Sequence, residues 1–197
     1  MVEATPGFEV WLVRHGETEW ARQGRHTGRT DVPLTDLGRA QARALADRLR
    51  GRAFGIVLAS PRVRALDTAR LAGFSDVVEV DPDLAEWDYG ADEGRTTLDI
   101  QRERPGWSIW DAGPRDGESI DAVARRADRV LSRVRTVPGD ALLFGHGHLL
   151  RILAARWLGL TPRHGALFAL STASISVLGW ERDRPVLLHW NEPADGS

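Results

Sequence analysis

The chain has 197 residues, of which 42% are hydrophobic and 27% charged, and its formal net charge is −2. This length and composition are typical of one globular domain with a full core, and the charge balance argues against a general nucleic-acid-binding or membrane-binding surface. Cysteine and lysine are both absent, which excludes disulfides, cysteine nucleophiles, Schiff-base chemistry and a Walker-type phosphate lysine. All 26 basic residues are therefore arginines, and any anion site must be built from arginine.

The sequence shows no signal for export or membrane insertion. Residues 1–7 are polar and too few for a secretory signal, and no apolar run reaches the length of a membrane span. We therefore expect a cytoplasmic protein that binds neither nucleic acids nor membranes.

Strand and helix patterns alternate along the chain. In chain order they predict a strand over 8–13, a helix over 36–50, a strand over 55–59, a helix over 63–72, a strand over 77–80, a helix over 118–137, a strand over 141–144, a helix over 148–158, and an antiparallel pair over 174–180 and 185–190. This alternation predicts a single α/β domain over residues 1–197, a three-layer α/β/α sandwich with a mostly parallel central sheet. The terminal pair could form an edge through which two copies make a homodimer.

Residues 81–117 break this alternation. The segment is rich in proline, glycine, aspartate and aromatic residues, and it predicts a long insertion with short helices, one of them over 97–104. Such insertions often close over a substrate site, so we expect a lid. Its aromatic residues could stack on a sugar ring or form the core of the segment itself, and we favour the core; they are Trp87, Tyr89, Trp107 and Trp110.

Two predicted strands end in a similar way. The first runs into Arg14-His15-Gly16 and the fourth into Gly145-His146-Gly147. If both strands are central and parallel, the two histidines lie at one edge of the sheet, where α/β proteins bind ligands. The glycines would let backbone N–H groups approach a ligand, and the helix that follows His146 would point its positive end at the same place. This is the outline of an anion site containing two histidines.

Two further segments add polar groups at the same edge. The strand over 55–59 leads into Ser60-Pro61-Arg62-Val63-Arg64, which supplies more arginine. Glu86 follows the third strand between apolar neighbours, an environment that favours a protonated carboxyl and general acid catalysis. Each residue alone could be an ordinary loop or packing residue, but their joint occurrence at strand ends favours a site. No carboxylate cluster accompanies the histidines, so we expect no metal.

These motifs resemble the histidine phosphatase superfamily, also called the phosphoglycerate mutase-like family. The resemblance covers nearly the whole chain and rests on five segments in order. They are 14–20 (RHGETEW), 27–35 (TGRTDVPLT), 60–69 (SPRVRALDTA), 86–94 (EWDYGADEG) and 146–151 (HGHLLR).

The resemblance implies a phosphoglycerate mutase-like fold and a residue-by-residue assignment of the site. His15 is expected to be the nucleophile that becomes phosphorylated, and Glu86 the group that protonates the leaving oxygen and later activates water. The phosphate pocket is expected to be lined by Arg14, Arg64 and His146, with further phosphate or substrate contacts from Thr27, Gly28, Arg62, Tyr89 and Gly147. The implied mechanism needs no metal and no cofactor.

Departures from the mutase branch favour hydrolysis. Mutases of this family carry Asn where this chain has Ala21, usually His where it has Asp88, and a substrate-binding lysine that it lacks. The segments fit better with actinobacterial acid phosphatases and fungal sedoheptulose-1,7-bisphosphatases. We therefore expect a phosphatase of small phosphate monoesters, acting on sugar phosphates or phosphorylated acids. A phosphoglycerate mutase, a non-catalytic phospholigand-binding protein and a phosphoprotein phosphatase remain the alternatives.

Overall fold

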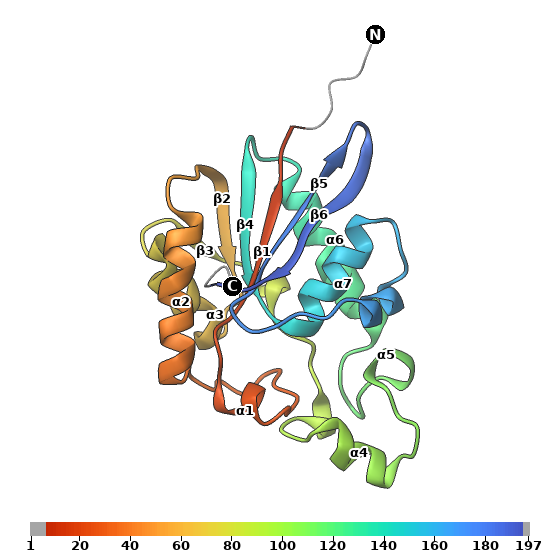
Figure 1. Ribbon diagram of the computed structural model, residues 1–197. Coiled ribbons are helices and arrows are strands. Elements are labelled where there is room, and N and C mark those ends of the chain that lie inside the picture. The colour runs from red at the N-terminus through yellow and green to blue at the C-terminus, as the bar shows by residue number, and fades with distance from the viewer. Residues whose placement is uncertain (1–6, 195–197) are drawn as a thin grey trace.

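The structure is a computed structural model and describes residues 7–194. Its centre is a six-stranded sheet in the order β3-β2-β4-β1-β5-β6 (Figure 1). The strands are β1 (Val10–Arg14), β2 (Phe54–Ala59), β3 (Val78–Val80), β4 (Asp140–Gly145), β5 (Ile175–Glu181) and β6 (Arg184–Glu192). β3, β2, β4 and β1 pair in parallel, and β5 and β6 extend the sheet antiparallel. The predicted mostly parallel sheet is confirmed, with an antiparallel edge.

Helices cover both faces of the sheet, giving the predicted three layers (Figure 1). α2 (Asp36–Leu49) and α3 (Val63–Ala69) cover one face, and α6 (Ile120–Val134) and α7 (Gly147–Trp157) cover the other. The alternation of side chains along β1 explains why both faces are covered. Val10 and Leu12 belong to the core on the α6–α7 side, whereas Trp11 and Val13 belong to the core on the α2 side. Both faces are therefore apolar and must be buried.

Helix ends differ from the prediction where local hydrogen bonds compete with the helix. The helix predicted over 63–72 is α3 followed by a π-helical turn, η1 (Arg70–Phe74), because Gly73 has φ of 97°. The helix predicted over 118–137 is shorter, since Ser119 caps α6 and the Glu118 N–H donates to the Asp88 carbonyl. A short helix that was not predicted, α1 (Glu19–Arg22), is capped by Thr18.

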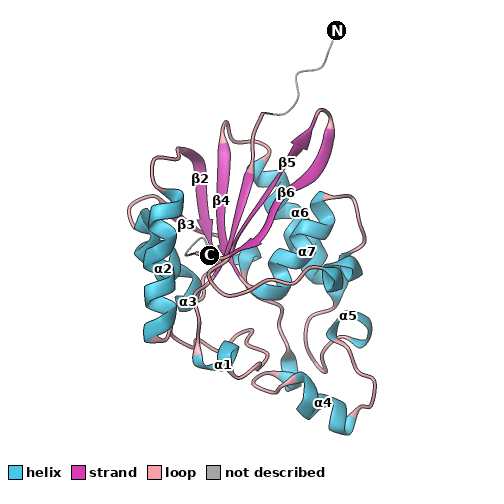
Figure 2. Ribbon diagram, in the orientation of Figure 1, coloured by secondary structure: helices cyan, strands magenta, loops and turns pink. Residues whose placement is uncertain are grey.

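The segment after β3 lies beyond the carboxyl ends of the strands, as loop with short helices (Figures 1 and 2). Its elements are η2 (Pro82–Leu84), η3 (Gly90–Asp92), α4 (Thr97–Glu103) and α5 (Ile109–Ala112). A further short helix, η4 (Pro162–Leu167), follows α7. Within residues 7–194, none of the helices is long and apolar enough to cross a membrane.

The loop after β1 is held by a close contact between two glycines. A Cβ on Gly16 would lie 2.4 Å from the Gly38 carbonyl oxygen, and one on Gly38 would lie 2.1 Å from the Glu17 carbonyl oxygen. Both distances are shorter than any side chain tolerates, so only glycine allows the first turn of α2 to press against this loop. The contact fixes the backbone that carries His15.

Candidate active site

His15 follows directly after β1, and its position is fixed by strand pairing. Its backbone N–H donates to the Gly145 carbonyl at the end of β4, at 3.0 Å. Its ring Nδ1 lies 2.7 Å from the Gly16 carbonyl oxygen, and since a carbonyl only accepts, Nδ1 carries the proton and Nε2 has the free lone pair. Burial, and then Arg64 and Arg14, lower the pKa of His15 well below its ordinary value of 6.5. His15 is thus a neutral imidazole that is nucleophilic at Nε2.

His146 lies against His15 and, like His15, carries its proton on Nδ1. The two ring centroids are 5.2 Å apart, and His146 is fully buried. Its Nε2 is 2.7 Å from the Ser60 hydroxyl, whose oxygen accepts the Arg62 N–H at 3.3 Å. With Ser60 donating to Nε2, Nδ1 carries the proton, and Nδ1 has no hydrogen-bond partner among residues 7–194. Because burial and then Arg64 lower the pKa of His146 well below 6.5, it provides a neutral N–H donor.

Arg14 and Arg64 are held by carbonyl groups rather than by carboxylates. Arg64 donates to the carbonyls of Thr27 (2.9 Å), Gly28 (3.2 Å) and Thr30 (3.0 Å). Arg14 donates to the Leu170 carbonyl at 2.5 Å. No ion pair within residues 7–194 involves either side chain, and the Nε–H of each is buried without a partner. Two positive charges therefore remain available for a phosphate, whose oxygens would accept from these donors.

Gly28 and Thr27 support the site from the loop before α2. A Cβ on Gly28 would lie 2.4 Å from the Trp87 carbonyl oxygen, so the residue packs against the insertion. Its N–H donates to both carboxylate oxygens of Glu93, at 2.9 and 3.0 Å, rather than pointing to a ligand. Its carbonyl holds Arg64, as does that of Thr27. The structure thus gives Gly28 a positioning contact and leaves Thr27 at the pocket wall.

Gly147 and Arg62 lie in the segments that follow β4 and β2. A Cβ on Gly147 would lie 3.4 Å from Arg14 Cζ, so the residue packs directly against the Arg14 guanidinium group. Arg62 donates its backbone N–H to Ser60, and its Nε–H is buried without a partner in the described chain. Both residues adjoin the site from the side of β2 and β4.

Glu86 is anchored to the first turn of α7, which differs from the apolar environment expected from sequence. Its carboxylate accepts three backbone N–H groups, those of Trp87 (2.9 Å), His148 (3.0 Å) and Leu149 (2.9 Å). The positive end of α7 therefore faces Glu86 as well as the site. The apolar neighbours Leu84 and Trp87 are fully buried, but they pack into the core instead of surrounding the carboxyl group.

The Tyr89 hydroxyl is engaged by a residue that the sequence left unassigned. It lies 2.6 Å from His148 Nδ1. Burial, and then Glu86, raise the pKa of Tyr89 well above 10, so the hydroxyl keeps its proton and can donate to this nitrogen. With Nδ1 accepting from Tyr89, His148 carries its own proton on Nε2. The ring of His26 lies 4.8 Å from that of Tyr89 and 5.9 Å from that of His148.

The site opens into a cavity of about 420 Å³ beyond the strand ends. Of the predicted site residues, it contains Arg14, His15, Thr27, Glu86 and Tyr89. The other predicted site residues adjoin these five directly or through one another; they are Arg64, His146, Arg62, Gly28 and Gly147. Unassigned residues also line it; they are Arg25, His26, Gln101, Ser108, His148 and Arg151, among others. Only their position in space identifies them, because no strand end precedes most of them.

The insertion supplies the outer wall of the cavity. Trp107 and Trp110 line it, while Trp87 is fully buried in the core. Trp107 is 4% exposed and also packs against His26, at a centroid distance of 5.6 Å. Trp107 therefore belongs to the hydrophobic core, as expected, and also forms part of the cavity wall.

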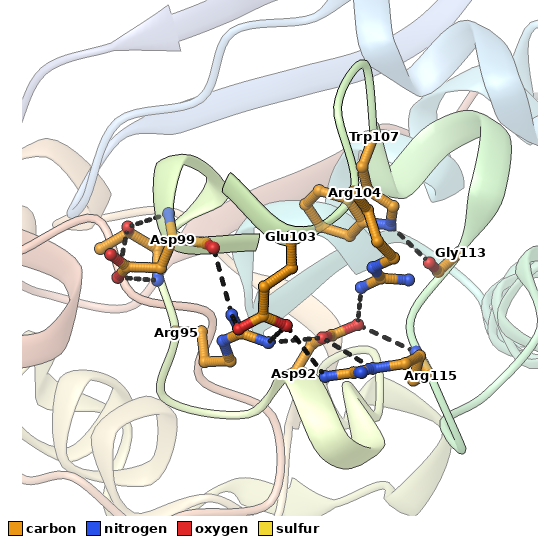
Figure 3. Close-up of polar contacts among 9 residues, drawn as sticks. Asp92, Arg95, Asp99, Glu103, Arg104, Trp107, Gly113 and Arg115 are labelled. Atoms are coloured by element: carbon orange, nitrogen blue, oxygen red, sulfur yellow. Dashed lines mark hydrogen bonds and ion pairs between the residues drawn. The ribbon is translucent and has the colours of Figure 1, made fainter. Parts of the chain in front are cut away.

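A buried carboxylate, Asp92, holds this wall together (Figure 3). It has no exposed surface and pairs with Arg104 at 2.5 Å, with Arg95 at 3.7 Å and with the Arg115 side chain at 3.7 Å. It also accepts the Arg115 backbone N–H at 2.9 Å. Glu103 joins the network from its exposed side, 2.6 Å from Arg95. Asp92 thus links three arginines that are spread over residues 95–115 of the insertion.

Within the described residues, no group of three or more histidine, cysteine, aspartate or glutamate side chains is arranged to hold a metal ion.

Comparison with known families agrees with this geometry. Residues 10–193 match the model of the histidine phosphatase superfamily, branch 1, and the chain belongs to that family. It is accordingly a phosphoric monoester hydrolase, as predicted, with the phosphoglycerate mutase-like fold.

Individual relatives support the predicted branch. An acid phosphatase of Mycobacterium tuberculosis is 47% identical over 175 residues, covering 86% of this chain and 85% of that protein. Sedoheptulose 1,7-bisphosphatase of Saccharomyces cerevisiae is 36% identical over 182 residues, covering 76% and 67%. The solved structure of an open reading frame from Mycobacterium tuberculosis has a TM-score of 0.89 at 42% identity, covering 95% of this chain and 99% of that one.

Because its buried histidines have lowered pKa values, we expect the protein to lose stability in acid. Desolvation is the largest cause that lowers the pKa of His15, His26, His146 and His148, so below pH 6.5 the unfolded chain binds more protons than the folded one. The free energy of unfolding should therefore fall as the pH decreases from 6.5, by up to about 1.4 kcal/mol per pH unit for each histidine. Urea unfolding at several pH values measures this. His148→Gln should make the dependence shallower and the exposed His164→Gln should not; stability that rises on acidification would contradict the prediction.

Replacing Asp92 should loosen the cavity wall. In Asp92→Asn three arginines face one another without their shared carboxylate, so we expect a loss of about 3 kcal/mol in the free energy of unfolding. KM should rise several-fold because Arg104, which pairs with Asp92 and lies 5.1 Å from the centroid of the Trp107 ring at the cavity wall, loses its partner. Glu103→Gln removes a carboxylate from the exposed side of the same network and should change little. Urea unfolding and steady-state kinetics test this, and an unchanged KM in Asp92→Asn would show that the network does not shape the cavity.

Proposed function

We propose that this phosphatase hydrolyses small phosphate monoesters, sugar phosphates or phosphorylated acids, through a phosphohistidine intermediate on His15, without a metal ion or cofactor. One observation carries the proposal. His15 is buried and neutral, with Nδ1 held by the Gly16 carbonyl, in a cavity that also contains Arg14 and Glu86. A neutral imidazole with its lone pair beside unpaired guanidinium groups is suited to attack a phosphate dianion.

In the first step Nε2 of His15 attacks phosphorus. The P–N bond forms as the P–O bond to the leaving group breaks, and protonated Glu86 gives its proton to the leaving oxygen. Arg14 and Arg64 stabilise the charge that spreads over the equatorial oxygens, and the Nδ1–H of His146 adds a neutral donor. Because these donors are held by backbone carbonyls and by Ser60, they need little rearrangement during the reaction.

In the second step water attacks the phosphohistidine. The Glu86 carboxylate takes a proton from the water, the P–N bond breaks, and the electron pair returns to Nε2. Inorganic phosphate leaves, and the free imidazole and protonated Glu86 are restored. The two steps add one water to the ester and release one alcohol and one phosphate.

The size and lining of the cavity support a small metabolite as substrate. About 420 Å³ accommodates a sugar phosphate or a phosphorylated acid, and Trp107 and Trp110 provide flat apolar surface. The names of the relatives, acid phosphatase and sedoheptulose 1,7-bisphosphatase, support the same class. The proposal places the enzyme in the cytoplasm, with residues 81–117 acting as its lid. The homodimer through residues 174–190 stays a prediction; these residues include the edge strand β6.

Substitution of the nucleophile tests the mechanism. His15→Ala should lower phosphate release by at least about 10³-fold, because no other group forms the covalent intermediate. The reaction must not be quenched with acid, because phosphohistidine is labile in acid. An alkaline quench followed by mass spectrometry should place the phosphoryl group on His15 in the unmodified enzyme. His164→Ala, which removes an exposed histidine, serves as control. Substantial turnover by His15→Ala would overturn the assignment, and a trapped phosphohistidine would exclude a purely binding protein.

A substrate panel tests the reaction class. Phosphorylated sugars, phosphorylated carboxylic acids and a phosphopeptide are compared by phosphate release, and 3-phosphoglycerate with its bisphosphate primer is assayed for isomerisation. We expect net phosphate release from the small esters at the highest kcat/KM. Isomerisation without phosphate release would identify a mutase, and preference for the phosphopeptide would identify a phosphoprotein phosphatase.

A further inference from the structure

One arginine outside the cavity directs three hydrogen bonds at the segment that carries Glu86 and its other two at Glu118. Arg126 lies in α6, is 14% exposed, and makes five hydrogen bonds with the five N–H donors of its guanidinium group. Three go to backbone carbonyls, those of Asp83 (2.8 Å), Ala85 (2.7 Å) and Glu86 (3.4 Å). The other two go to the carboxylate of Glu118, at 2.8 and 2.6 Å.

Glu118 holds the next two residues of the same segment. Its carbonyl accepts the indole N–H of Trp87 at 2.7 Å, and its backbone N–H donates to the Asp88 carbonyl at 2.9 Å. The backbone from Asp83 to Asp88 is therefore attached on one side to the Arg126–Glu118 pair. On the other side the Glu86 carboxylate is attached to the N-terminus of α7.

We propose that Arg126, fixed by its bidentate pair with Glu118, is a positioning residue that places the Glu86 carboxyl group for proton transfer. The inference rests on the acid–base role given to Glu86 in the proposed function. Without Arg126 the backbone carbonyls of Asp83, Ala85 and Glu86 lose the donor that they share. The Glu86 carboxyl group is then held only by its contacts with the N-terminus of α7 and with the Trp87 N–H. Proton transfer is sensitive to such displacements, because the carboxyl must lie within hydrogen-bond distance of the leaving oxygen.

The geometry separates Arg126 from the other arginines of α6. Arg129 pairs with the Asp83 side chain at 2.6 and 2.8 Å, but it is 58% exposed and contacts no backbone of the segment. It is a matched control on the same helix, directed at the same segment. Lysine at position 126 would keep the charge but has only three donors on a single nitrogen, so it cannot reproduce the planar fork.

Comparing substrates with different leaving groups distinguishes a role in proton transfer from a purely structural role. p-Nitrophenolate leaves without a proton, whereas the alkoxide of glycerol 3-phosphate requires one. kcat/KM includes only steps up to phosphoryl transfer to His15, so the ratio of kcat/KM for glycerol 3-phosphate to that for p-nitrophenyl phosphate reports proton donation by Glu86. The ratio is measured for the unmodified enzyme and for Glu86→Gln, Arg126→Met, Arg126→Lys and Arg129→Met.

We expect Glu86→Gln to lower the ratio by about 10²-fold, the usual size of general acid catalysis. Arg126→Met should lower it by about tenfold, Arg126→Lys by less in the same direction, and Arg129→Met should leave it unchanged. If Arg126→Met does not fold, the ratio measured for Arg126→Lys tests whether Arg126 positions Glu86.

Two outcomes would overturn the inference, and they differ in what else they affect. A ratio that falls in Glu86→Gln but stays constant in the folded Arg126 variants would make Arg126 a structural residue only, leaving the proposed function intact. A ratio that stays constant in Glu86→Gln would remove the acid role of Glu86 and, with it, the basis of the inference.

Discussion

The parallel pairing of β1, β4 and β2 is the constraint on which the site depends. The His15 N–H donates to the Gly145 carbonyl, and the Ser60 N–H donates to the Phe144 carbonyl, so the pairing continues one residue beyond the strands. These two bonds bring three loops to one edge of the sheet, although they come from positions about 45 and 85 residues apart. Every group that would contact the phosphoryl group is placed relative to this edge.

Arginine has two different uses in this chain. Where it builds the scaffold it pairs with carboxylates, as Arg126 does with Glu118 and Arg104 with Asp92. In the site, Arg14 and Arg64 are held by neutral carbonyls instead, which orients each guanidinium group without cancelling its charge. Burial, and then the remaining positive charge, lower the pKa of the neighbouring imidazoles and keep them neutral, and the same charge is available to an anionic substrate. The hydrogen-bond partner, rather than the residue type, decides which role an arginine has.

Neutral histidines complete this arrangement, and each tautomer is set by a neighbour. A carbonyl directs the lone pair of His15 to Nε2, Ser60 leaves the proton of His146 on Nδ1, and Tyr89 leaves that of His148 on Nε2. With these tautomers, the ring nitrogen that is not engaged by the named neighbour is an acceptor in His15 and a donor in His146 and His148. Burial contributes to all three, because it disfavours the charged form that would remove the distinction.

Much of this could be predicted from the sequence. The apolar runs ending in Arg14-His15 and in His146 predicted the central strands, since a strand buried on both faces must be apolar throughout. The five motifs predicted the family, because each lies at a loop whose chemistry is local. Helix ends were predicted less well: Glu118 was assigned to a helix, but its N–H is taken by Asp88, and α1 depends on a single turn capped by Thr18.

The sequence by itself therefore determined the layers, the order of the elements and the residues that arrive at the sheet edge. Only the tertiary structure decided what each of those residues contacts: Glu86 at the α7 amides, Gly28 bonded to Glu93, Tyr89 bonded to His148, and Arg126 behind Glu86. The reason is physical. Periodicity and strand ends follow from neighbours along the chain, whereas charge state, tautomer and hydrogen-bond partner depend on groups that meet only when the sheet and the insertion pack together.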